Sequence, residues 1–153
     1  MAMMGKSAIL SFLLAVLMTP LSEGSAGAVE IPPGEAGAKT ALERSPRHHE
    51  WADIAVPGRG GKVSAFVAYP ERKDKAPVVI VIHEVFGLTD WIRAVADRLA
   101  AEGFIAMAPD LLSGRGPGGG GTDKFGSRDD AVKAVRTLGD QEVVAILNAV
   151  SRY

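Results

Sequence analysis

The sequence predicts an α/β fold organised around one central strand. Residues 78–82, Val-Val-Ile-Val-Ile, form an unbroken run of β-branched side chains with no polar face. Such a run is typical of a strand that is buried on both faces of a mostly parallel sheet. A segment with helical spacing and a second short apolar run, Phe104 to Ala108, follow it. Strand, helix and strand joined by short connections indicate a right-handed crossover between two parallel strands.

A β-hairpin is predicted before the central strand. Its two apolar-rich segments are Trp51 to Val56 and Val63 to Tyr69, and the connection between them, Pro57 to Gly61, contains several glycines. Glycines in such a connection give the backbone the freedom that a tight turn needs. The central strand itself is expected from about Pro77 to His83.

The helix of the crossover has clear signals at both ends. Thr89 or Asp90 can cap its first turn by accepting a hydrogen bond from a free amide group. Gly103 ends it in the left-handed conformation. Apolar residues recur at helical spacing between these ends, and the charged residues fall outside that stripe. The stripe comprises Ile92, Val95, Ala96 and Leu99, and the charged residues are Arg93, Asp97, Arg98 and Glu102.

Two further helices are predicted after the second parallel strand. Ser127 to Leu138 carries two aspartates in its first turn, where carboxylates are favourable, and Gly139 stops it. Asp140 can cap a following helix that runs to the end of the sequence. The apolar face of the first comprises Ala131, Val132, Val135 and Leu138, and that of the second comprises Val143, Val144, Leu147 and Val150.

The amino-terminal residues indicate export. Lys6 precedes an apolar run from Ala8 to Met18, and residues 26–28, Ala-Gly-Ala, fit the small-x-small pattern of a signal-peptide cleavage site. Residues 1–28 are therefore predicted to be a signal peptide, and the mature protein to be periplasmic or secreted without stable membrane insertion. An uncleaved anchor is the alternative, although the run is short for a membrane span. Residues 29–46 are predicted to be a flexible lead-in, and residues 47–153 the folded domain.

Composition excludes several classes of function. The 17 basic and 18 acidic side chains nearly balance, so no electrostatic feature favours nucleic acid as a partner. The sequence contains no cysteine, which rules out disulfides and a thiol nucleophile within these residues.

Two polar segments invite a ligand hypothesis. Residues 48–50, His-His-Glu, could be metal ligands, but with no further ligand cluster we interpret them as polar residues entering a strand. The glycine-rich segment from Ser113 to Thr122 could cradle a phosphate, yet it lacks the Gly-Lys-Ser/Thr ending of a P-loop. We interpret it as a mobile surface loop over the site.

The central segment also resembles a known family. The sequence Val-Ile-Val-Ile-His-Glu-Val-Phe-Gly-Leu at residues 79–88 and Ala-Pro-Asp-Leu-Leu at residues 108–112 are similar to the amino-terminal half of the dienelactone hydrolase family. The similarity runs from about Glu50 to the end of the chain. It implies an α/β-hydrolase fold (a hairpin, a strand–helix–strand unit with parallel central strands, then helices) that stops before the nucleophile elbow.

The resemblance assigns roles at the end of the central strand. It implies that Glu84 lies beside the nucleophile and helps to govern its ionisation, and that the backbone N–H of Val85 is one donor of the oxyanion hole. The alternative for Glu84 is a solvated loop carboxylate. Arg128 stands where some relatives have an arginine that pairs with a substrate carboxylate, with an exposed arginine at a helix start as the alternative. His83 and Glu84 do not form a zinc-protease motif, because position 87 is Gly.

The nucleophile is missing from the 153 residues. No serine lies in a Gly-x-Ser-x-Gly elbow, and His48, His49 and His83 all precede the place where an elbow would come. The family's Cys, Asp and His positions would lie beyond Tyr153. We therefore expect a chain that is inactive alone, with Val78 to Ile82 as an unpaired sheet edge that favours aggregation. The last helix is expected to lack the sheet on which it packs.

Three hypotheses for function follow. The first is a hydrolase of small-molecule esters or lactones of the dienelactone hydrolase type, with no metal or organic cofactor. The second is a non-catalytic exported half-domain. The third is another α/β-hydrolase, such as a serine esterase or peptidase. An elbow centred on Cys would favour the first hypothesis, and one centred on Ser the third.

Overall fold

The computed structural model of the protein describes residues 34–153. The predicted signal peptide, residues 1–28, and the first five residues of the predicted lead-in lie outside the described residues. Within residues 34–153, no helix combines the length and the apolar character needed to cross a membrane.

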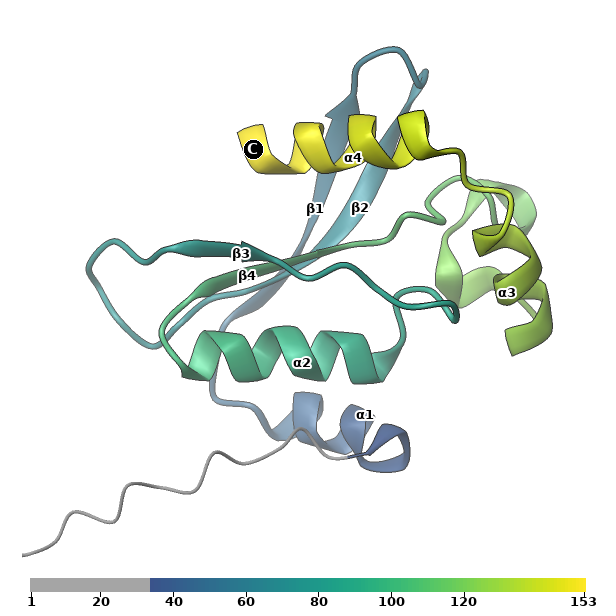
Figure 1. Ribbon diagram of the computed structural model, residues 1–153. Helices are drawn as coiled ribbons and strands as arrows, with labels where there is room; N and C mark the ends of the chain where they lie inside the picture. The colour runs from purple at the N-terminus through teal and green to yellow at the C-terminus, as the bar shows by residue number, and fades with distance from the viewer. Residues whose placement is uncertain (1–33) are drawn as a thin grey trace, which may run out of the picture. The chain divides into compact units, whose positions relative to one another are not determined.

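Four strands form one mixed sheet in the order β1-β2-β4-β3 (Figure 1). β1 (His49–Val56) and β2 (Gly61–Ala68) pair antiparallel and form the predicted hairpin. β4 (Ile105–Pro109) pairs antiparallel with β2 and parallel with β3 (Val78–Ile80). The α/β fold class and the parallel crossover predicted from the sequence are therefore confirmed.

The central strand of the prediction lies at the edge of the described sheet. β3 is shorter than expected, although the N–H of Val81 continues its ladder by donating to Met107 O at 2.8 Å. The prediction that residues 78–82 are buried on both faces is wrong, because Val78 is 57% exposed and Ile82 54% exposed. β4 covers one side of β3, and no other described strand pairs with its second side. The predicted unpaired edge is confirmed.

Helices α2 and α4 cover opposite faces of the sheet (Figure 1). α2 (Asp90–Ala101) begins after Thr89, whose side chain accepts from the N–H of Ile92, and it ends before Gly103, which has φ +96°. α4 (Asp140–Arg152) buries Ile146, Ala149 and Val150 in one core cluster with the inward side chains of the hairpin. The expectation that this last helix lacks a sheet to pack on is wrong, because the hairpin provides that surface.

The residues predicted to be a flexible lead-in contain a helix. α1 (Glu35–Arg44) lies against the outer side of α2, with Ala38 fully buried and Leu42 packed against the core on the α2 side of the sheet. Ala38 and Leu42 are four residues apart and so share one helix face. The segment contains too few large apolar residues to show helical periodicity, and its order comes from packing on α2.

Asp97 ties α2 to the segment that links α1 and β1. Its carboxylate accepts hydrogen bonds from Ser45 Oγ at 2.6 Å and from Arg47 Nε at 2.8 Å, and it lies 2.7 Å from His49 Nε2. Burial alone would raise the pKa of Asp97, but the hydrogen bonds from Arg47, Ser45 and His49 outweigh it, and the pKa is lowered. Asp97 was expected outside the buried stripe of α2; it is buried because α1 and its linker cover that side.

The other helical segments differ from the predictions at their ends and in one apolar face: Val144, predicted to be buried, is 56% exposed, and Ile146 is buried instead. Two short 3₁₀ turns that were not predicted, η1 (Pro117–Gly119) and η2 (Thr122–Lys124), lie between β4 and α3. α3 (Arg128–Val135) begins after Ser127, whose hydroxyl accepts from the N–H of Asp130, and it ends three residues earlier than expected. α4 has Gly139, and not Asp140, at its N-cap position. Asp140 is instead the first helical residue, where its charge interacts favourably with the positive end of the helix dipole.

Candidate functional site

A tight turn follows β3 and presents the two groups singled out from the sequence. The N–H of Gly87 donates to Glu84 O at 3.1 Å, which closes a β-turn over residues 84–87. Within that turn the N–H of Phe86 donates to Glu84 Oε2 at 3.1 Å, so the carboxylate is anchored to its own turn. The N–H of Val85 has no acceptor among the described residues. A carboxylate and a free backbone donor thus lie side by side at the carboxyl end of a parallel strand.

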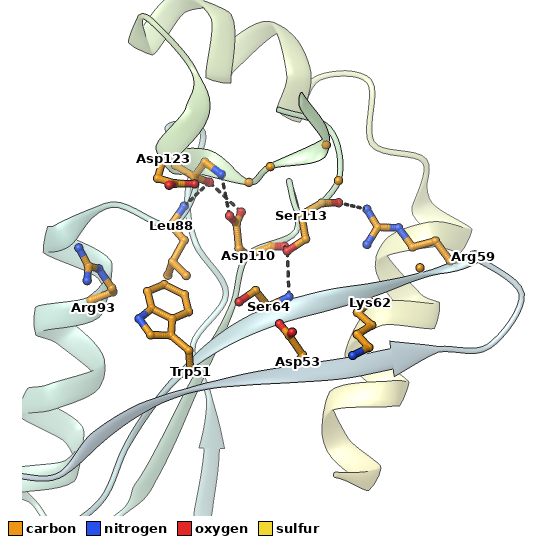
Figure 2. Close-up of a pocket in the computed structure, with 17 residues that line it drawn as sticks. Trp51, Asp53, Arg59, Lys62, Ser64, Leu88, Arg93, Asp110, Ser113 and Asp123 are labelled. Atoms are coloured by element: carbon orange, nitrogen blue, oxygen red, sulfur yellow. Dashed lines mark hydrogen bonds between the residues drawn. The ribbon is translucent and has the colours of Figure 1, made fainter. Parts of the chain in front are cut away.

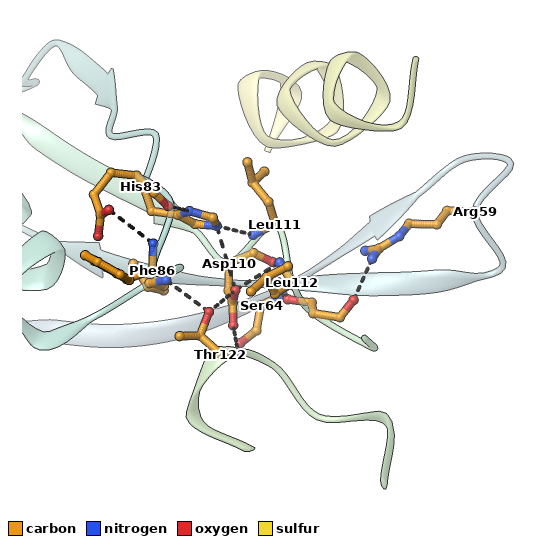
Figure 3. A network of polar contacts seen from close by, with 11 residues as sticks. Arg59, Ser64, His83, Phe86, Asp110, Leu111, Leu112 and Thr122 are labelled. Atoms are coloured by element: carbon orange, nitrogen blue, oxygen red, sulfur yellow. Dashed lines mark hydrogen bonds and ion pairs between the residues drawn. The ribbon is translucent and has the colours of Figure 1, made fainter. Parts of the chain in front are cut away.

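A buried aspartate at the end of the neighbouring strand supports this turn. Asp110 follows β4 and is only 6% exposed. Its Oδ1 accepts from Leu112 N at 3.0 Å and from Thr122 Oγ1 at 2.7 Å, while Oδ2 accepts from Thr122 N at 2.7 Å. Thr122 Oγ1 in turn accepts from Leu88 N at 3.0 Å (Figure 3). This Asp110–Thr122–Leu88 chain clamps the end of the glycine-rich segment onto the turn.

Gly87 is required by the close approach that this clamp creates. Its φ is +81°, a conformation that side chains with a Cβ rarely adopt. A Cβ at this position would also collide with the side chain of Thr122. The glycine in His-Glu-Val-Phe-Gly therefore lets the turn close and lets Thr122 reach Leu88.

Arg128 lies beside the turn, at the start of α3. Its guanidinium lies 5.1 Å from the centre of the Phe86 ring and forms an ion pair with Glu35 at the start of α1. Glu35, Glu84 and Phe86 line a small hollow of about 280 Å³ together with Thr89 and Trp91. The structure therefore places Arg128 against Phe86 of the turn that carries Glu84, with its side chain 57% exposed at the start of α3 and Glu35 as its carboxylate partner.

A larger cleft of about 990 Å³ lies on the other side of the Asp110–Thr122–Leu88 chain, and all three of these residues line it (Figure 2). Trp51 and Arg93 stand at one end of it and Arg59 and Lys62 at the other, and the glycine-rich segment borders it. Neither Glu84 nor Val85 lines this cleft. We place the candidate site at the turn and the smaller hollow beside it, because Glu84 lines that hollow and Arg128 contacts two other lining residues, Phe86 and Glu35.

The histidines and their neighbours form no metal centre. Among residues 34–153, no three His, Cys, Asp or Glu side chains come close enough together to hold a metal ion. His49 contacts Asp97, and His48 lies 3.5 Å from Glu50. His83 is buried with both ring nitrogens in contact with backbone groups, Glu84 O at 2.8 Å and Leu111 N at 3.1 Å.

Sequence inspection alone did not identify Asp110, Thr122 or His83 as parts of this site. One signal was present: Asp110 directly follows the strand parallel to β3, and the carboxyl ends of parallel strands meet at one edge of a sheet. No local pattern indicates that Thr122, at the end of the glycine-rich segment, is the group that Asp110 holds. The glycine-rich segment, expected to lie over the site, reaches the turn only at its end, through Thr122, and otherwise borders the larger cleft.

Comparison with known proteins places these features in a family. The model of the dienelactone hydrolase family matches residues 63–153, more than half of the chain. The chain belongs to the dienelactone hydrolase family. The match includes the turn after β3, Asp110, the glycine-rich segment and Arg128, whereas Glu35 lies outside it.

Individual relatives agree with this assignment. A Synechocystis protein named "putative carboxymethylenebutenolidase" is 33% identical over 104 residues, which are 65% of this chain and 41% of that protein. A protein of the same name from Saccharolobus solfataricus is 52% identical over 61 residues, 40% of this chain and 23% of its own length.

A solved structure shows the same fold. The crystal structure named "putative dienelactone hydrolase" from Klebsiella pneumoniae matches with a TM-score of 0.53 at 31% identity, over 69% of this chain and 43% of that one. The chain therefore spans about two fifths of the Synechocystis relative and of the Klebsiella structure that it matches.

Proposed function

We propose that the protein hydrolyses ester or lactone bonds of a small molecule, and that this chain contributes the oxyanion side of the active site. The observation that carries the proposal is the turn at residues 84–87. The N–H of Val85, which has no acceptor among residues 34–153, can stabilise the negative oxygen that forms when a nucleophile attacks a carbonyl carbon. Glu84 is anchored beside it, where a carboxylate can influence the ionisation of a neighbouring nucleophile.

The substrate side of the proposal rests on Arg128. Its guanidinium lies against Phe86 and pairs with a carboxylate, the side chain of Glu35. A planar guanidinium binds carboxylates in a defined orientation, so a substrate with a carboxylate can take the place of Glu35. No metal or organic cofactor enters the proposed mechanism.

We identify no nucleophile among the residues of this sequence. The 153 residues contain no cysteine, and no serine has the glycine spacing of a nucleophile elbow. We therefore propose that these residues alone do not hydrolyse esters, and that the native protein provides the nucleophile. We also propose export through the signal peptide at residues 1–28, which predicts a mature amino terminus at Val29.

The first experiment determines what the native protein is. An antibody against residues 123–138 would isolate it from cell fractions, and its intact mass would be measured. A product that begins at Val29, exceeds the mass of this chain and hydrolyses 4-nitrophenyl acetate or a dienelactone is expected. A product that ends at Tyr153 and hydrolyses neither compound would refute the hydrolase function.

The second experiment tests the oxyanion donor. Val85 is the second residue of its β-turn, a position where proline is favoured, so Val85→Pro deletes the N–H while the turn is retained. Loss of one oxyanion donor lowers kcat on the order of 10² to 10³-fold. Val85→Ala keeps the N–H and is the matched control, with kcat expected within about threefold of the native protein because its backbone donor is intact. Equal activity of the two variants would contradict the assignment.

A further inference from the structure

His83, the residue before Glu84, has a defined protonation state because of its two contacts. The side chain is buried, with Nδ1 2.8 Å from Glu84 O and Nε2 3.1 Å from Leu111 N (Figure 3). A carbonyl oxygen can only accept and a backbone N–H can only donate. Nδ1 must therefore carry the proton and Nε2 the lone pair. The ring is neutral and exists as a single tautomer.

The nearest charged group does not alter this assignment. Asp110 Oδ1 lies 4.0 Å from His83 Nε2, beyond hydrogen-bond distance. Both oxygens of that carboxylate already accept from Leu112 or Thr122. The lone pair of Nε2 is directed instead at the Leu111 N–H, in the first loop residues after β4.

The contact at Nδ1 determines the direction of another group. Glu84 C=O and Val85 N–H belong to the same peptide unit, which is planar and trans, so the two bonds point in opposite directions. Holding the carbonyl oxygen therefore fixes where the Val85 N–H points. Gly87 N also donates to this oxygen, at 3.1 Å, so both acceptor positions of the carbonyl are filled. Hydrogen bonds that polarise the carbonyl also make the N–H of the same peptide a stronger donor.

We propose that His83 is a positioning residue for the oxyanion donor: its imidazole bridges the end of β4 to the Glu84–Val85 peptide and aims the Val85 N–H. Its catalytic consequence rests on the proposed hydrolase function, whereas the bridge itself does not. A histidine that merely filled a polar position in the core would need neither a proton on Nδ1 nor a ring orientation that points Nδ1 at Glu84 O. The bridge also joins the carboxyl ends of two parallel strands through one rigid ring.

Two substitutions separate the two halves of the bridge. Asparagine places its amide group at the level of Nδ1, so His83→Asn can still donate to Glu84 O but cannot accept from Leu111 N. Glutamine reaches the level of Nε2, so His83→Gln can still accept from Leu111 N but cannot donate to Glu84 O. His48, whose side chain is 68% exposed, offers matched control variants, His48→Asn and His48→Gln.

The measurements are made on the isotopically labelled native protein. The ring nitrogens of His83 should show a protonated Nδ1 and an unprotonated Nε2. The Val85 amide resonance should move in His83→Gln and stay near its native position in His83→Asn, while hydrogen exchange at Leu111 should accelerate only in His83→Asn. A ring protonated at Nε2, or a Val85 resonance that His83→Gln moves no more than His48→Gln does, would overturn the proposal.

Kinetics add a readout that a purely structural role would not change. A misdirected oxyanion donor weakens binding of the transition state and leaves the ground state unaffected, so His83→Gln should lower kcat on the order of 10-fold with an unchanged KM. His83→Asn should retain kcat within about threefold because its donor to Glu84 O remains. Equal kcat for the two variants would count against positioning. If the native protein hydrolyses no ester, the proposed function fails, and the Val85 resonance still decides the role of His83.

Discussion

Replacing Asp110 by asparagine should destabilise the folded protein and loosen the turn that carries Glu84 and Val85. The carboxylate accepts three hydrogen bonds, from Leu112 N and Thr122 Oγ1 at Oδ1 and from Thr122 N at Oδ2. Asparagine has only one side-chain oxygen. Whichever way its amide is oriented, the NH₂ group faces a backbone N–H that now has no acceptor.

The magnitude follows from these contacts. A hydrogen bond to a charged group contributes about 1.5–3 kcal/mol, and a buried donor left without a partner costs about 1–3 kcal/mol. The two figures describe partly the same loss, so the free energy of unfolding should fall by about 2–4 kcal/mol. The hydrogen bond from Leu88 N to Thr122 Oγ1 should also weaken, because both Thr122 groups that hold this residue in place donate to the carboxylate that is replaced.

Urea unfolding followed by circular dichroism measures the stability, and amide exchange at Leu88 and Thr122 measures the clamp. Asp123→Asn is the matched control, because Asp123 lies on the same segment with its side chain 71% exposed. An exposed substitution of that kind should change stability by no more than about 0.5 kcal/mol. If Asp110→Asn were as stable as the control, or if exchange at Leu88 were unchanged, the clamp would not support the turn.

Three other predictions concern groups outside the turn. The hydrogen bond to Glu50 raises the pKa of Tyr69 to about 12. In a Tyr153→Phe variant, where Tyr69 is the remaining tyrosine, ultraviolet titration should show ionisation near this value, and adding Glu50→Gln should lower the pKa of Tyr69. The stability that this bond adds should be lost as the pH rises through about 12. The pKa of Asp97 is lowered, so its contribution to the free energy of unfolding should be present above the ordinary pKa of about 4 and should disappear as the pH falls below that value. In Asp97→Asn, the free energy of unfolding measured in urea should therefore depend less on pH across this range. A charge on an exposed strand edge opposes pairing with the edge of another molecule. Val78→Lys should therefore raise the protein concentration at which the 153-residue chain begins to aggregate, as measured by light scattering. An unchanged concentration would exclude β3 as the aggregation site.

Several features of the fold were predictable because their signals are local. The β-branched run at residues 78–82, the hairpin glycines and the Thr89 cap each depend on residues within a few positions of one another. The strand–helix–strand order then limits the topology, because such crossovers are right-handed. Glu84 and Val85 could be located for the same reason, since they directly follow a strand.

Other features depend on residues that are distant in the sequence. α1 was missed because its order comes from Ala38 packing on α2, and Asp97 was misplaced because its partner Arg47 is 50 residues away. The helix or strand propensity of a segment does not depend on such distant contacts. Packing against another element can therefore decide the structure of the segment against its propensity. The edge position of β3 likewise depends on which strands pair.

The sequence by itself determined the order of the strands and helices from β1 to α4, the membership in the dienelactone hydrolase family and the place of the turn after β3. Only the tertiary structure decided how that turn is held. His83 reaches Leu111 across 28 residues, and Leu88 reaches Thr122 across 34. These hydrogen bonds exist because the crossover brings the carboxyl ends of β3 and β4 together, which no local pattern encodes.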